Sequence, residues 1–127
     1  MVKLDSLNYV ETAEKVIFAL KENSRKGQLE LTTSQIRNIL AMVSEIYNEV
    51  IHEEGNVLTQ KSMERIQYLK LHIIYSAGRE VKVKKFVQKA ELIKIIESVK
   101  DNKDRFLIFC KYMEALVAYH RYYGGND

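Results

Sequence analysis

The sequence predicts an all-α fold, a single antiparallel bundle of five helices, or of six if short extra turns form. The chain contains no proline and only five glycines, so few positions interrupt a helix. Apolar residues recur at helical spacing in five segments, and no segment shows the strict alternation of a half-buried strand. At this length we expect one domain, residues 1–127, with short connections between antiparallel helices.

The first predicted helix covers residues 9–22. Asn8 and Glu11 before and inside it have the spacing of a capping box, in which two side chains satisfy free backbone N–H groups of the first turn. Residues 23–27 contain Asn, Ser and Gly and predict a turn.

The second predicted helix begins after a second capping box, made by Thr32 and Gln35, and ends near His52. Its apolar residues recur on one face: Ile36, Ile39, Leu40, Val43, Ile46, Tyr47, Val50 and Ile51. This face predicts burial against the rest of the bundle.

Three more helices are expected in the second half of the chain. The third begins at residues 58–59 and runs to Ala77, where Gly78 predicts its end. The fourth begins between residues 81 and 83 and continues to Val99. Asp101 and Asn102 form a turn and cap, the fifth helix covers 103–123, and Gly124 and Gly125 end it.

Several classes of function are excluded or disfavoured by composition. Cys110 is the only cysteine, so it forms no internal disulfide, and no signal peptide or membrane-length apolar run is present, so we expect a cytoplasmic protein. The chain has no phosphate-binding glycine loop, nucleophile elbow or zinc-type cysteine and histidine spacing. We therefore expect no enzyme activity, no cofactor and no metal site.

Two residue groups could suggest chemistry, and each has a simpler interpretation. Glu49 and His52 form one Glu-x-x-His pattern, but a di-iron bundle needs a second copy, and both residues lie opposite the apolar face of their helix. We therefore expect an exposed acidic face. Cys110 and His120 lie on an apolar helix face, which predicts a buried small side chain and a histidine with a satisfied hydrogen bond.

The positive charge is concentrated in the second half of the chain. Residues 1–60 carry six Lys and Arg against nine Asp and Glu, whereas residues 61–127 carry fourteen against eight. On the third helix Lys61, Arg65, Tyr68 and His72 have the spacing i, i+4, i+7, i+11, which places cations and aromatic rings on one side. This arrangement suits phosphates and bases, and it equally suits a solvated face.

The fourth helix adds a stronger signal. Lys82, Lys85 and Lys89 are neighbours on one face, where like charges repel. Arg79 and Lys84 lie near the same helix start, where the helix dipole disfavours cations. A nucleic-acid backbone would reverse both penalties, so we predict nucleic-acid binding, with a solvated cationic surface as the alternative.

The last helix has a second apolar and aromatic face, which consists of Ile108, Tyr112, Ala115, Tyr119 and Tyr122. A helix that is apolar on two sides either lies at the centre of its bundle or offers one side to another subunit. The pattern does not distinguish these two positions.

The chain resembles the small helical subunit of type III-A CRISPR effector complexes, the Csm ribonucleoprotein. The matching segments are residues 31–37 (LTTSQIR), 68–71 (YLKL), 77–79 (AGR), 86–87 (FV) and 112–120 (YMEALVAYH). The resemblance implies a non-catalytic subunit that stacks in several copies as an inner filament and lines the groove where guide RNA pairs with target RNA. Its implied partners are both RNAs, copies of itself, and the backbone and large subunits.

The predicted RNA-binding residues come from two lines of reasoning. Arg37 and Arg79 lie in segments that match the family. Lys61, Arg65, Lys82, Lys84, Lys85 and Lys89 come from the distribution of charge. The alternative function is a helical adaptor that binds proteins and has no nucleic-acid role.

Overall fold

The computed structural model describes residues 3–126, and it confirms the all-α class. Six α-helices follow one another: α1 (Tyr9–Glu22), α2 (Thr33–Val50), α3 (Gln60–Arg79), α4 (Val81–Lys89), α5 (Leu92–Val99) and α6 (Lys103–Tyr122). Within the described residues, β pairing is limited to an isolated antiparallel bridge between Val57 and Asn102. No helix in this part of the chain is both long and apolar enough to cross a membrane.

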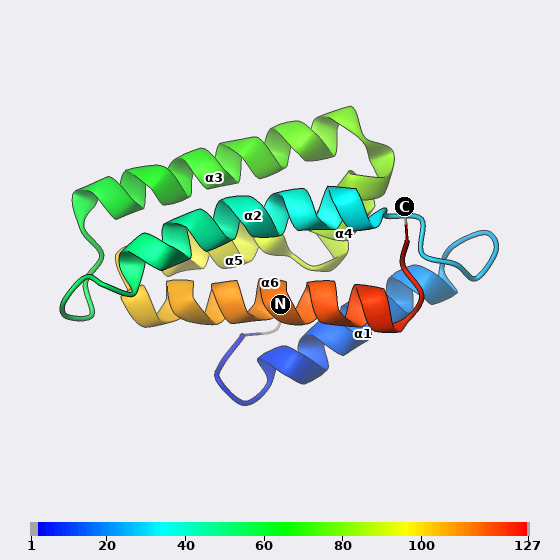
Figure 1. Ribbon diagram of the computed structural model, residues 1–127, viewed down its shortest axis with the longest axis horizontal. Helices are drawn as coiled ribbons and strands as arrows, with labels where there is room; N and C mark the ends of the chain where they lie inside the picture. Colours follow the sequence, from blue (N-terminus) through cyan, green and yellow to red (C-terminus); the bar gives the residue numbers. More distant parts are fainter. Residues whose placement is uncertain (1–2, 127) are drawn as a thin grey trace.

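Helix α6 lies at the centre of the bundle. It packs against α1, α2 and α5, while α3 packs against α2, α4 and α5. Helix α2 runs antiparallel to both α3 and α6, and α4 and α5 lie behind α2 and α6 (Figure 1). The side chains of α6 that fill the core are Phe106, Phe109, Cys110, Tyr112, Met113 and Leu116.

The second apolar face of α6 is largely explained by this central position. Tyr112 is fully buried, and Ala115 and Tyr119 are half-buried against neighbouring helices. This face is most exposed toward its C-terminal end, where Tyr122 is 77% exposed.

The predicted fourth helix is wrong as a single element, because the chain breaks it into α4 and α5. In one continuous helix the apolar residues of the first half (Val83, Phe86, Val87, Ala90) would point about half a turn away from those of the second half (Leu92, Ile95, Ile96, Val99). All eight are buried in the folded protein. The break at Ala90 and Glu91 turns both halves toward the same core.

The break has a defined local geometry. Glu91 adopts a left-handed conformation with φ 55° and ψ 37°, which an α-helix does not accommodate. The buried Tyr112 hydroxyl donates a hydrogen bond to the carbonyl oxygen of Ala90 at 3.0 Å. The Ala90 carbonyl therefore accepts a hydrogen bond, although α4 ends at this point and its helical partner is missing.

Two other helix starts test the predicted capping boxes. The capping box of Thr32 and Gln35 is confirmed, with both reciprocal hydrogen bonds present. The one at Asn8 is wrong: its backbone has φ −103° and ψ −7°, whereas a capping side chain needs an extended backbone to reach the first turn. The Asn8 side chain instead accepts from the N–H of Asp5.

Two helix ends were predicted at glycines, and one of the two predictions is confirmed. Gly124 has φ 93° and follows α6 directly after Tyr123, as predicted. Gly78 does not end α3, which continues to Arg79 and ends where Glu80 becomes extended. The prediction failed because a glycine stops a helix only where the backbone turns left-handed, and Gly78 stays helical.

Candidate nucleic-acid interface

The structure separates the predicted RNA-binding cations into three places. Lys82, Lys84, Lys85 and Lys89 lie on α4, beside Arg79 at the end of α3. Lys61 and Arg65 line a groove between α2 and α3. Arg37 is exposed on α2.

One face of α4 is cationic because the other is buried. Val83, Phe86 and Val87 anchor α4 in the core, and helical spacing then turns Lys82, Lys85 and Lys89 outward. We call these three lysines the α4 cation face. Lys84 is also exposed, on the opposite flank of the helix.

The positive charges of these side chains are hardly neutralised by nearby carboxylates. Lys85 Nζ lies 4.0 Å from Glu30 Oε1, at the outer limit of an ion pair, and both side chains are largely exposed. Within residues 3–126, Lys82, Lys84, Lys89 and Arg79 form no ion pair. A screened contact of this kind contributes little, so the repulsion along α4 is not cancelled within the molecule.

Arg79 lies in the last turn of α3, not at the start of α4. The helix dipole favours a cation there, so the argument that Arg79 opposes a helix start is wrong. Its guanidinium lies 5.7 Å from the centre of the exposed Tyr75 ring, a cation–π contact. The dipole penalty does apply to Lys82 and Lys84, which follow Val81 in the first turns of α4.

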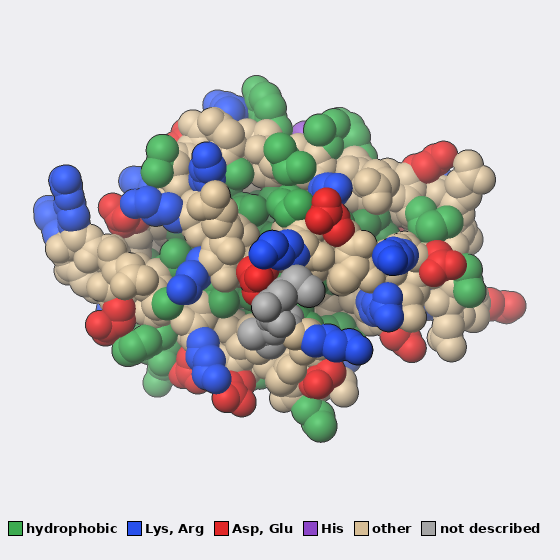
Figure 2. Space-filling model, turned by 180° about the vertical axis from the view of Figure 1, so that it is seen from behind, with side chains coloured by type: hydrophobic (Ala, Val, Ile, Leu, Met, Phe, Trp, Pro, Cys, Tyr) green, Lys and Arg blue, Asp and Glu red, His purple; other side chains and the backbone are tan. Residues whose placement is uncertain are grey.

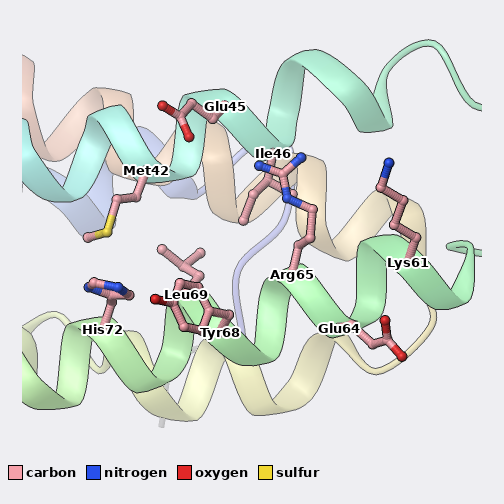
Figure 3. A pocket seen from close by; sticks show the side chains of 9 residues that line it. All are labelled: Met42, Glu45, Ile46, Lys61, Glu64, Arg65, Tyr68, Leu69 and His72. Atoms are coloured by element: carbon pink, nitrogen blue, oxygen red, sulfur yellow. The ribbon is translucent and has the colours of Figure 1, made fainter.

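The groove between α2 and α3 brings together the cations and rings predicted on the third helix. Lys61, Arg65, Tyr68 and His72 all line a pocket of about 460 Å³. Figure 3 shows Lys61 and Arg65 pointing from α3 toward α2. The predicted alignment of these four side chains along one side of the helix is therefore confirmed.

The charges in this groove are nearly balanced. The guanidinium of Arg65 pairs with the carboxylate of Glu49 across the two helices. Glu45 and Glu64 also line the pocket, and Glu64 accepts a hydrogen bond from Gln60. A phosphate would gain less here than on α4, where carboxylates are fewer.

Arg37 lies away from both places. Helical geometry puts it about a third of a turn around α2 from Asn38 and Met42, which line a second hollow between α2 and α3. It is exposed and lies outside the groove. Arg79 lines that second hollow, whereas Arg37 does not.

Sequence reasoning missed the contribution of α2 to the groove. Met42 and Glu45 line the pocket opposite Tyr68 and His72. Their spacing with Glu49, i, i+3, i+7, places them on a flank next to the buried face, which is the signal that could have identified them.

The side chains considered for other chemistry have structural roles. Cys110 is buried, and that burial raises the pKa of its thiol. His120 is buried and donates from Nε2 to the carbonyl of Leu31 at 2.6 Å, as predicted. Glu49 and His52 are exposed. Within the described residues, no group of three or more His, Cys, Asp or Glu side chains could hold a metal ion.

The surface charge on the rear of the molecule is mixed. Figure 2 shows Lys and Arg side chains spread over the face that contains α4 and α5, with Asp and Glu among them. The positive charge of the second half is therefore distributed, and α4 is where several lysines share one helix face.

Comparison with known proteins identifies the family. A family model described as Csm2 Type III-A matches residues 8–126. The chain is 39% identical over 127 residues to the CRISPR system Cms protein Csm2 of Streptococcus thermophilus, covering 100% of both chains. It is 38% identical over 120 residues to that of Mycobacterium tuberculosis, covering 94% of each chain.

A third relative extends the match. The CRISPR system Cms protein Csm2 of Enterococcus italicus is 32% identical over 127 residues, covering 95% of this chain and 91% of that one. The resemblance to the small helical subunit of type III-A effectors is thereby confirmed. The chain belongs to the Csm2 family of type III-A CRISPR systems.

Proposed function

We propose that this chain is the non-catalytic small subunit of a type III-A CRISPR ribonucleoprotein in antiviral defence. In this role it contacts the backbone of guide RNA and target RNA without reading their sequence, and it stacks with copies of itself in an inner filament. Family membership supports the place in the complex. The observation that carries RNA contact is the α4 cation face and Arg79, whose charges are largely uncompensated within the molecule.

Backbone contact suits this arrangement physically. Exposed lysines on a helix can approach phosphates, and each contact releases condensed counterions. Base pairing with the guide supplies sequence specificity, so the protein needs to read none. We assign phosphate contacts first to Arg79, Lys82, Lys84, Lys85 and Lys89. Arg37, Lys61 and Arg65 stay predictions, because each lies away from this cluster.

Reversing charge on α4 tests the proposal. The variant Lys82→Glu/Lys89→Glu should weaken binding of the full chain to a guide–target duplex of mixed sequence. The slope of log affinity against log salt should become shallower by about 1 to 2, because each lost phosphate contact removes somewhat under one unit. Fluorescence anisotropy at several salt concentrations measures both quantities.

A matched control separates local contact from net charge. Lys3→Glu/Lys111→Glu makes the same change of charge at two exposed lysines outside α4. It should leave most of the salt slope intact. Equal losses in both variants would mean that only overall charge matters, and undetectable binding by the wild-type chain, alone and in the assembled complex, would favour the adaptor function.

Contacts with copies or other subunits have support from α3. Three of its apolar side chains outside the α2–α3 groove are strongly exposed: Leu71, Ile74 and Tyr75. Exposed aromatic and aliphatic residues gathered on one helix face are typical of protein interfaces. This face remains available for assembly while α4 contacts RNA.

A further inference from the structure

The pocket between α2 and α3 does not have the composition of a phosphate site. One of its cations, Arg65, is already paired with Glu49. Glu45 adds a carboxylate to the rim, and it forms no ion pair or side-chain hydrogen bond within residues 3–126. A phosphate placed near Glu45 would be repelled, so these residues suit a ligand group that donates hydrogen bonds.

The walls of the pocket are apolar and partly aromatic. Ile46 and Leu69 form a buried floor, and Met42 lines the α2 side. The rings of Tyr68 and His72 meet edge to face, with centroids 4.7 Å apart. Tyr68 is 63% exposed, so a planar ligand can reach it without unfolding the site. Apolar walls with one accessible aromatic ring are typical of base-stacking sites.

The polar groups of the pocket come from both helices. Glu45 lines it from α2, and Figure 3 shows the Lys61 ammonium directed from α3 toward α2, while Glu64 turns away. A carboxylate accepts hydrogen bonds from the exocyclic amino group of cytosine. The amino group of adenine offers the same donor chemistry, whereas uracil carries a carbonyl oxygen at the corresponding position.

A second hollow connects this pocket with the proposed RNA track. It is lined by Asn38, Met42, Ser76 and Arg79, among others, and shares Met42 with the pocket. A strand bound at Arg79 can therefore follow the α2–α3 groove toward Lys61. Along α3 these two cations are about 27 Å apart, enough for several nucleotides of an extended strand.

We propose that the α2–α3 pocket holds one unpaired nucleobase that carries an exocyclic amino group, adenine or cytosine, from the bound RNA. Tyr68 stacks on the base, Glu45 accepts a hydrogen bond from its amino group, and Lys61 contacts the adjoining phosphate. This inference rests on the proposed function, because the strand must first be held by the α4 cation face and Arg79.

Two single-stranded probes test the proposal. An oligocytidine and an oligouridine of equal length have the same charge and differ at the C4 substituent of the base. The wild-type chain should bind the oligocytidine about threefold to tenfold more tightly, as expected for one hydrogen bond that uracil does not make. Tyr68→Ala should remove most of this preference, while the slope against salt stays unchanged.

The variant Glu45→Gln tests the proposed hydrogen bond directly, with the same two probes. The glutamine amide accepts a hydrogen bond from cytosine and can also donate one to the carbonyl of uracil. The preference for cytosine should therefore shrink mainly through tighter binding of the oligouridine. Circular dichroism of both variants checks that the helical fold is intact.

The outcomes separate this inference from the proposed function. Equal binding of both probes by the wild type, with the Lys82→Glu/Lys89→Glu variant still weaker, would overturn the base pocket and leave backbone binding supported. A Tyr68→Ala variant that binds RNA normally but fails to join the effector complex would make the pocket a protein-docking site and overturn the inference. Binding of neither probe by a chain that still binds the guide–target duplex would overturn the base pocket alone.

Discussion

Glu53, in the turn after α2, connects the beginnings of two helices through its side chain and its backbone carbonyl. Its Oε2 atom accepts hydrogen bonds from Ser62 Oγ at 2.6 Å and from Thr59 Oγ1 at 3.2 Å, at the start of α3. The backbone carbonyl of Glu53 accepts from the Lys103 ammonium at the start of α6. The Ser62 hydrogen bond is the main reason that the pKa of Glu53 is lowered, with smaller contributions from Thr59 and Lys103.

Replacing this carboxylate should make stability depend less on pH. Glu53→Gln is expected to lower the free energy of unfolding by about 1 to 2 kcal/mol near neutral pH, because a charge-assisted hydrogen bond is lost. A lowered pKa stabilises the fold above the ordinary value of 4.5 and stops doing so as pH falls through the folded-state value. The difference between variant and wild type should therefore shrink as pH falls below about 4.5.

Urea unfolding at neutral and acidic pH measures this difference. Glu54→Gln is the matched control, since Glu54 is the adjacent exposed carboxylate. The control should stay close to wild type at both pH values. A Glu53→Gln deficit that persists unchanged in acid would contradict the role assigned to the ionised side chain.

At the scale of elements, the break between α4 and α5 determines which side of each helix meets solvent. With a continuous helix, either the apolar residues of α4 or those of α5 would face water. The break buries both sets and leaves the α4 cation face exposed. The geometry of one residue, Glu91, therefore affects the surface that we propose for RNA.

The conformation of Glu91 predicts an unusual response to glycine. Glu91→Gly should keep the stability unchanged or raise it by up to about 1 kcal/mol, because glycine adopts a left-handed conformation without strain from Cβ. Gln88→Gly, three residues earlier in helical α4, should lose about 1 kcal/mol. Thermal unfolding followed by circular dichroism compares the two, and an equal loss at both sites would refute a strained break.

At the scale of the whole molecule, the C-terminal residues close the fold onto the start of α2. Gly125 N–H donates to the carbonyl of His120 at 2.8 Å, and Thr33 N–H donates to the carbonyl of Asn126 at 3.3 Å. His120 in turn donates to Leu31. Figure 1 shows the C-terminus beside the first turn of α2. Residues almost ninety positions apart are joined in this way.

Two glycine-to-alanine variants test this closure. A Cβ at Gly125 would lie 2.1 Å from His120 Cε1, so Gly125→Ala should cost about 1 to 3 kcal/mol through displacement of a buried ring. Gly78 has open space around it and helical geometry, so Gly78→Ala should add about 0.5 to 1 kcal/mol. Denaturant titrations measure the free energy of unfolding of both variants, which should fall for Gly125→Ala and rise for Gly78→Ala. If Gly125→Ala were neutral, the C-terminal residues would not stabilise the fold.

Local chemistry made much of this protein predictable from its sequence. The absence of proline and the helical period of apolar residues indicated the all-α class, and the side chains of Thr32 and Asn102 accept hydrogen bonds at helix starts where caps were expected. The same period aligned Lys61, Arg65, Tyr68 and His72. These features depend on residues within about three helical turns of one another, which is the range over which a sequence pattern carries information.

The tertiary structure decided what depends on contacts between distant residues. Tyr112 donates a hydrogen bond to the Ala90 carbonyl at the end of α4, twenty-two positions earlier in the chain. Glu49 on α2 forms an ion pair with Arg65 on α3. Met42 and Glu45 complete the pocket from α2, and Arg37 lies apart from the other cations. By itself the sequence determined the all-α class, the family and the charge of each helix face, but not the break between α4 and α5. Only packing determined which charges are compensated and where a pocket forms, because both depend on side chains brought together by the fold.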